Sequence, residues 1–160
     1  MRRLILTLTA LSFVATAAFA VDPGRAEGAI IVDGNRIPLV YAYAVGHQSN
    51  EVTNRKDDMR IVLTDKPLPD ATKLEDIDYS FPDGTYGMVV CVSHDDKVSH
   101  VVVQHAKGLY DGGYFESDPS YTFHRTKSNG GPIAGTLSAK SVTTNTMTFS
   151  FDVEFDAAAR

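Results

Sequence analysis

The sequence of 160 residues contains a single cysteine, Cys91, and this scarcity excludes several kinds of site. One cysteine cannot form an intramolecular disulfide, a cysteine-rich zinc site or an iron–sulfur cluster. Basic residues are also scarce: 15 stand against 20 acidic residues, and the net charge of -5 argues against general nucleic-acid binding. After the first twenty residues there is no apolar run of about 18 residues or more, so we expect no membrane-spanning helix there.

Catalytic signature motifs are missing as well. The sequence contains no Gly-x-Ser-x-Gly elbow, no His-Glu-x-x-His, no phosphate-binding loop and no dinucleotide-binding fingerprint. No motif therefore requires a cofactor, and an enzymatic activity is not the favoured interpretation.

The first twenty residues have the three parts of a secretory signal peptide. Arg2 and Arg3 form a positive n-region, Leu4–Ala17 an apolar h-region, and Ala18-Phe19-Ala20 a cleavage site with small residues at both ends. We expect cleavage after Ala20 and delivery to the periplasm or the outside of the cell.

Cleavage would leave one domain of residues 21–160. Loss of the two leader arginines would change its net charge from -5 to -7. The lone cysteine lies in the apolar run Met88–Val92, where a buried and unreactive thiol is expected. Because Cys91 lies far from the cleavage site, no lipid anchor is expected after leader cleavage.

Alternation of apolar and polar residues dominates the chain after the leader. In Met147–Phe155, five apolar residues alternate with four polar ones, so all the apolar side chains share one face of a strand. Asp33-Gly34 predicts a tight hairpin turn, and Thr72–Glu75 has the pattern of a capping box at the start of one short helix. Further strands are predicted at 29–32, 36–45, 59–64, 86–93, 98–105, 121–125 and 133–139.

Short strands separated by turn residues are typical of a β-sandwich or a barrel. We predict an all-β fold: a single antiparallel β-sandwich of about 7–8 strands with one short helix.

Four stretches of this pattern resemble a family of secreted bacterial β-rich domains of unassigned function. They are GAIIVDGNRIPLVYAYAV at 28–45, MRIVLTDKPLP at 59–69, IAGTLSAKS at 133–141 and FSFDVEFDAA at 149–158. The resemblance covers most of the chain after the leader and implies a secreted β-rich domain. It implies no activity, cofactor or site residue.

The most unusual stretch runs from Gly108 to Tyr121, where glycines separate aromatic and acidic residues. We expect a long loop here, since long loops on rigid sheets are frequent binding sites. Aromatic rings beside carboxylates suit stacking on a sugar or capture of a cationic group. Alternatively, the aromatic side chains pack back over an open end of the sheet. The candidate ligand-binding residues are Tyr110, Asp111, Tyr114, Phe115, Glu116 and Tyr121.

A second candidate site surrounds the turn between the strands predicted at 86–93 and 98–105. His94 and His100 flank this turn, which also contains Asp95 and Asp96. A zinc or copper site needs three or four convergent ligands, and these four residues are the candidate metal ligands. The alternative is that the histidines are ordinary strand residues and the acids are solvated turn residues.

Three functions remain open from the sequence. The favoured one is a non-enzymatic module that binds a protein, a glycan or a small ligand. The others are a metal-dependent or hydrolytic enzyme that uses His94 and His100 with nearby carboxylates, and a structural module that pairs through a sheet edge. Convergence of the histidines and acids in one pocket would favour the enzyme. Outward aromatic residues in 108–121 would favour binding, and inward ones would favour the structural module.

Overall fold

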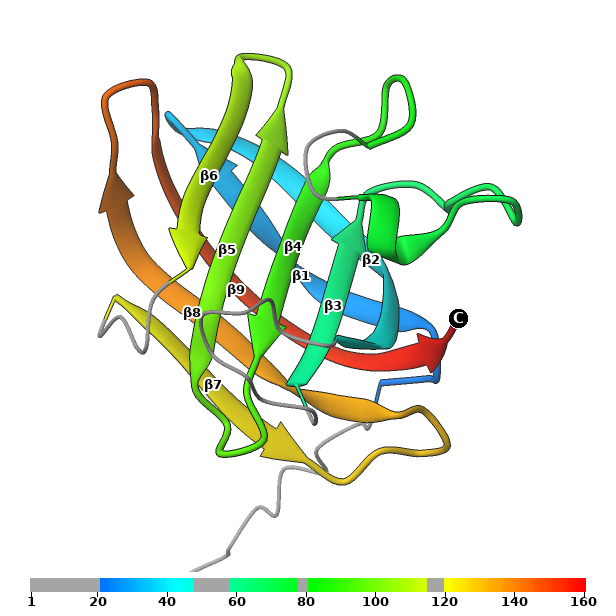
Figure 1. The fold of residues 1–160 in the computed structure, drawn as a ribbon. Coiled ribbons are helices and arrows are strands. Elements are labelled where there is room, and N and C mark those ends of the chain that lie inside the picture. The colour runs from blue at the N-terminus through cyan, green and yellow to red at the C-terminus, as the bar shows by residue number, and fades with distance from the viewer. Residues whose placement is uncertain (1–20, 48–57, 78–80, 115–119) are drawn as a thin grey trace, which may run out of the picture.

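A computed structural model of the chain describes residues 21–47, 58–77, 81–114 and 120–160. Within these residues there are nine strands and one 3-10 turn, shown in Figure 1. The strands are β1 (Arg25–Val32), β2 (Asn35–His47), β3 (Asp58–Thr64), β4 (Gly87–Val92), β5 (Val98–His105), β6 (Gly108–Tyr114), β7 (Tyr121–Thr126), β8 (Ile133–Thr143) and β9 (Thr148–Ala159), and the 3-10 turn is η1 (Leu74–Asp76). The leader predicted at 1–20 lies outside the described residues.

All nine strands belong to one sheet, in the order β6-β5-β4-β3-β2-β1-β9-β8-β7. Neighbours in this order are antiparallel, and a short parallel contact joins β2 to β9 at Tyr43 and Ala44. The predicted all-β antiparallel class is confirmed. The sheet has nine strands where about 7–8 were predicted, so neither this strand count nor the predicted sandwich of two sheets is confirmed. The reason is the pairing of β1 with β9, which joins the two halves of the chain into one continuous sheet.

The strand that the sequence analysis missed is β6. The stretch after His105 was expected to be a long loop, but Gly108–Tyr114 forms a hairpin with β5. Glycine has a low strand propensity, and three glycines in β6 hide its alternation. Hydrogen bonding to β5 outweighs this local preference. Of the stretch expected to be a loop, residues 115–119 lie outside the described residues.

The sheet is curved (Figure 1). Side chains from every strand contribute to one apolar core. On β9, the side chains of Phe149, Phe151, Val153 and Phe155 are buried, as the alternation predicts. The edge strand β6 reaches the same core, because the ring centroid of its Tyr110 lies 5.0 Å from that of Phe149. A curved sheet can thus enclose a core without a second sheet.

Apolar side chains cover one region of the outer face of the sheet. There, the connection from β3 to β4 packs apolar side chains over β3, β4 and β5. The predicted short helix is a single 3-10 turn, η1, whose Leu74 and the following Ile77 are both 2% exposed. No side chain caps this turn, so the predicted capping box does not form. The side chains that pack here are Leu68, Leu74, Ile77 and Phe81 against Val62, Val89 and Val102.

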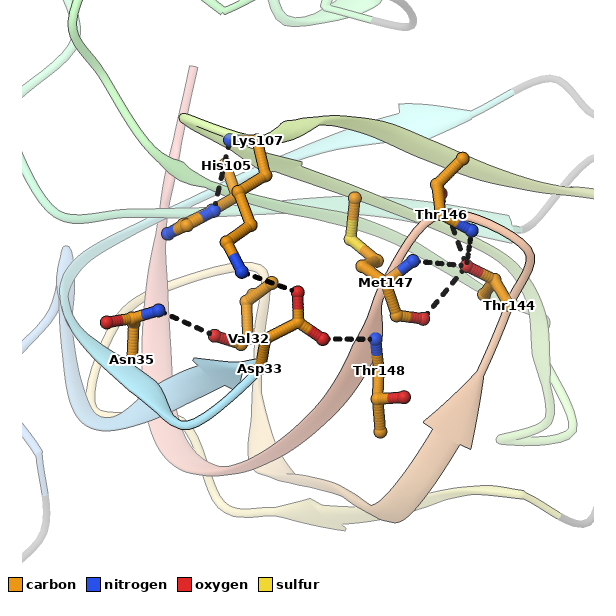
Figure 2. A network of polar contacts seen from close by, with 9 residues as sticks. All are labelled: Val32, Asp33, Asn35, His105, Lys107, Thr144, Thr146, Met147 and Thr148. Carbon is orange, nitrogen blue, oxygen red and sulfur yellow. Dashed lines mark hydrogen bonds and ion pairs between the residues drawn. The ribbon is translucent and has the colours of Figure 1, made fainter.

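The predicted turn at Asp33-Gly34 is confirmed, with φ angles of 45° and 82° at the two residues. The turn also joins other parts of the molecule, as Figure 2 shows. The Asp33 carboxylate accepts a hydrogen bond of 2.8 Å from the Thr148 backbone N–H at the start of β9. It also accepts one of 2.9 Å from the Lys107 ammonium in the turn between β5 and β6. One carboxylate therefore connects three hairpins at this end of the sheet.

Candidate functional site

Two tyrosines of the first predicted site, Tyr110 and Tyr121, point into the protein. Tyr121 is buried and its ring stacks on Phe151 at a centroid distance of 6.1 Å. Tyr110 is half-buried against the core. The inward orientation agrees with the alternative reading of this stretch, in which aromatic side chains pack onto the sheet.

Asp111, a further member of that site, has its own contact on β5. Asp111 is exposed, and its carboxylate oxygen lies 2.8 Å from Nε2 of His100, a residue of β5. Tyr114 is the last residue of β6, and Phe115 and Glu116 lie outside the described residues. The two rings that the structure describes, those of Tyr110 and Tyr121, form no exposed aromatic platform.

The four candidate metal ligands are divided among separate contacts. Asp96 forms an ion pair with Arg125 of β7, with 2.6 Å between oxygen and nitrogen. The hydroxyl of Ser93, followed by the ammonium of Lys97, holds the pKa of the Asp95 carboxyl well below its usual value. His94 is exposed in the turn, whereas His100 is buried and contacts Asp111.

No group of three histidine, cysteine, aspartate or glutamate side chains in the described ranges is arranged to hold a metal ion. The metal site at His94, Asp95, Asp96 and His100 therefore stays a prediction that this geometry does not support.

A buried polar row on β3, β4 and β5 was not anticipated from the sequence. Cys91 is paired in register with Arg60 on one side and His100 on the other, so the three side chains share one face. All three are buried, as predicted for the thiol. The Arg60 guanidinium donates to the carbonyl oxygens of Leu74 and Glu75 and so attaches η1 to the sheet. Because Cys91 has no exposed surface, no substrate reaches it in this structure.

A groove of about 520 Å³ lies on the outer face of β1, β9 and β8. This part of the sheet lies beyond the region covered by the connection from β3 to β4. Its floor consists of small residues, and longer side chains stand along its sides. The lining residues are Gly28, Ala29 and Ile31 of β1, Arg36 of β2, Ser138, Ala139 and Lys140 of β8, and Ser150, Phe151 and Asp152 of β9.

Strand register orders the groove into rows. Ile31 is paired with Arg36 of β2 and with Ser150 of β9. Lys140 continues this row on β8, within an irregularity of the ladder between Ala139 and Val142. The adjacent row contains Ala29, Asp152 and Ser138. The arrangement is an apolar centre with a cation on each side and a carboxylate one row away.

The centre of the groove is unusual on this surface. Ile31 is 41% exposed, and it is the one large apolar residue classed as exposed among the described residues. Burial of such a side chain by a ligand is favourable, since apolar surface leaves water. An apolar part of a ligand can therefore contact Ile31 in the groove.

Three charged side chains in the groove have no partner within the described part of the protein. Arg36, Lys140 and Asp152 are all exposed and form no side-chain hydrogen bond or ion pair there. By contrast, Lys107 and Arg125 each contact a carboxylate. The three charges of the groove are thus available to a ligand.

Sequence reasoning missed this groove because its lining residues come from four strands at opposite ends of the chain. Alternation identifies Ser150 and Asp152 as outward residues of β9, but it does not identify their neighbours. One local signal was present: Ile30-Ile31-Val32 breaks the alternation, and its middle residue points outward. The groove forms only because β1 pairs with β9, which places Ile31 beside Ser150.

Searches against protein-family models, curated proteins and solved structures gave no match for this chain. The resemblance to secreted bacterial β-rich domains therefore stays a prediction. In the described ranges, no helix has the length and apolar character needed to cross a membrane.

Proposed function

We propose that this chain is an exported, non-enzymatic binding module and that the groove on β1, β8 and β9 is its ligand site. The observation that carries the proposal is an exposed apolar residue, Ile31, with three charged side chains around it that have no partner among the described residues. The volume of about 520 Å³ lies within the range of roughly 300–1,000 Å³ that is usual for small-molecule sites. Among the ligand classes expected from the sequence, the groove therefore favours a small ligand.

The enzyme alternative has less support. His94 and His100 do not share a pocket: one is exposed in a turn and the other is buried against Asp111. His105 lies beside Tyr86, with ring centroids 5.7 Å apart, and His124 is exposed on β7. A hydrolytic or metal centre needs such groups to converge.

The structural alternative gains from the inward orientation of Tyr110 and Tyr121, because these two rings are not available to a ligand. It would act through β6 or β7, the two end strands of the sheet. One side chain of the end strand β7, that of Arg125, already forms an ion pair with Asp96 of the same chain. The groove remains the more specific feature, because it combines shape with charges that lack partners.

The experiment uses an uncharged fluorescent probe, N-phenyl-1-naphthylamine, with the full chain expressed from Met1. We expect saturable binding at one site per chain. Ser150→Trp fills the groove from its floor and should abolish binding. His124→Trp adds the same ring to an exposed position of β7 outside the groove and should leave binding unchanged.

Absence of binding to the unmodified chain would contradict the proposal. Equal binding by the two tryptophan variants would also contradict it, since the probe would then bind elsewhere. Circular dichroism of both variants establishes that the sheet is intact.

A further inference from the structure

We infer that the ligand is a small organic monoanion with an apolar body, and that Arg36 and Lys140 recognise its anionic group. This inference rests on the proposed function, because it specifies the ligand of the same groove. The groove carries two positive charges and one negative charge, although the whole chain has a net charge of -5. A local excess of positive charge on an acidic protein attracts anions to that place.

The two cations lie at opposite ends of the row that contains Ile31 and Ser150. Arg36 is on β2 and Lys140 is on β8, three strand spacings apart, or about 14 Å across the sheet. Both side chains are long and exposed, and neither is held by a described carboxylate. An anionic group placed between them would be approached by a guanidinium from one side and an ammonium from the other.

The apolar body of the ligand has a flat floor to lie on. Ala29 and Gly28 precede Ile31 on β1. Ala29 has a small side chain and Gly28 has none, so a ligand can approach the sheet closely here. Gly28 also sits tightly on β9, because a Cβ atom there would lie 2.2 Å from the carbonyl oxygen of Asp152. Close contact with the neighbouring strand β9 therefore keeps this position without a side chain. A ligand ring or chain can contact the sheet and cover Ile31.

Asp152 limits the ligand to one anionic group. Its carboxylate lies in the adjacent row, beside Ala29 and Ser138, and forms no ion pair with Arg36 or Lys140. A second anionic group extending over this row would meet a like charge. A hydroxyl or amino group at the same place would donate to Asp152. The carboxylate thus orients the ligand, with its anion toward the row of Ile31.

The test compares two matched probes. 1-Anilinonaphthalene-8-sulfonate has the same aromatic skeleton as N-phenyl-1-naphthylamine and adds one sulfonate. We expect the sulfonate probe to bind the full chain more tightly, with an affinity that falls as ionic strength rises. Arg36→Gln and Lys140→Gln should each weaken it about two- to fivefold, the range expected for exposed ion pairs. Each change should weaken binding of the sulfonate probe by a larger factor than binding of the uncharged probe.

Asp152→Asn tests the role of the carboxylate in the groove. Removal of a like charge should tighten binding of the sulfonate probe about twofold. Lys127→Gln removes an exposed cation outside the groove lining and serves as the matched control. It should leave both affinities unchanged.

The outcomes separate this inference from the proposed function. Equal affinity for the two probes, or weaker sulfonate binding in Asp152→Asn, overturns the inference while the binding module stands. Failure of both probes to bind overturns the module and the inference together. Dimerisation that Ser150→Trp abolishes, measured by sedimentation, would assign the groove to a second copy of the chain and overturn the inference.

Discussion

Asp33 and Lys107 are 74 residues apart in sequence, yet their side chains form an ion pair of 2.9 Å between two turns at one end of the sheet (Figure 2). The pair joins the first hairpin of the described domain to the turn between β5 and β6. It is a contact that forms only when the sheet curves on itself. The pKa of the Asp33 carboxyl depends on this ion pair.

Replacement of Lys107 by glutamine should reduce stability at neutral pH more than at acidic pH. The hydrogen bond from Lys107, followed by the one from the Thr148 backbone, lowers the pKa of the Asp33 carboxyl below its usual 3.8. A carboxyl with a lowered pKa in the folded state contributes stability above the unfolded pKa, and this contribution is lost as pH falls through the folded pKa. The measurement is the melting temperature of the full chain as a function of pH.

The control for this prediction is Lys127→Gln, which removes an exposed lysine that forms no ion pair with a described residue. Its melting curve should follow that of the unmodified chain at every pH. A deficit in Lys107→Gln that grows as the pH falls below 3.8 would show that the ion pair is not its cause.

Gly135→Ala should destabilise the fold by about 1–3 kcal/mol, the usual cost of overpacking. A Cβ atom at this position of β8 would lie 2.4 Å from the ring of Phe123 and 2.5 Å from the carbonyl oxygen of His124. Urea unfolding of the full chain measures the change. Gly46→Ala is the matched control, because a Cβ atom there meets nothing within 4 Å, and a comparable loss in the control would contradict the packing argument.

Phe149→Ala should cost about 3–5 kcal/mol of unfolding free energy, as large-to-small changes of a buried aromatic residue do. Phe149 is 1% exposed and contacts the rings of Tyr110 and Phe151. Its neighbour Ser150 faces outward, so Ser150→Ala should change the unfolding free energy by about 0.5 kcal/mol or less. Equal costs for the two changes would refute the assignment of inner and outer faces on β9.

The leader should be removed between Ala20 and Val21 when the chain is expressed from Met1 in a secreting bacterium. The small residues at Ala18 and Ala20 suit the cleavage site, and Ala20→Arg should prevent processing. Intact mass and N-terminal sequencing of the exported protein measure the outcome. Recovery of an exported protein that still begins at Met1 would rule out a cleaved leader.

Most strand positions followed from local patterns, and β6 shows where these patterns were insufficient. Met147–Phe155 alternates clearly, and the structure places β9 there with its aromatic side chains inward. In Gly108–Tyr114 the glycines remove the alternation, and the segment becomes a strand because β5 supplies hydrogen-bond partners. The candidate site differed from its prediction more than the strands did, because the groove depends on contacts between strands that are distant in sequence.

The sequence by itself determined the features that depend on neighbouring residues: the period of two that makes strands, the Asp33-Gly34 turn, and the buried thiol within an apolar run. The tertiary structure decided the features that depend on partners. The pairing of β1 with β9 joined the strands into one sheet and brought Ile31, Arg36, Lys140 and Asp152 to one groove. Packing against the core oriented Tyr110 and Tyr121 inward. Strand alternation says which way a side chain points, but only the order of strands in the sheet determines which other side chains lie beside it.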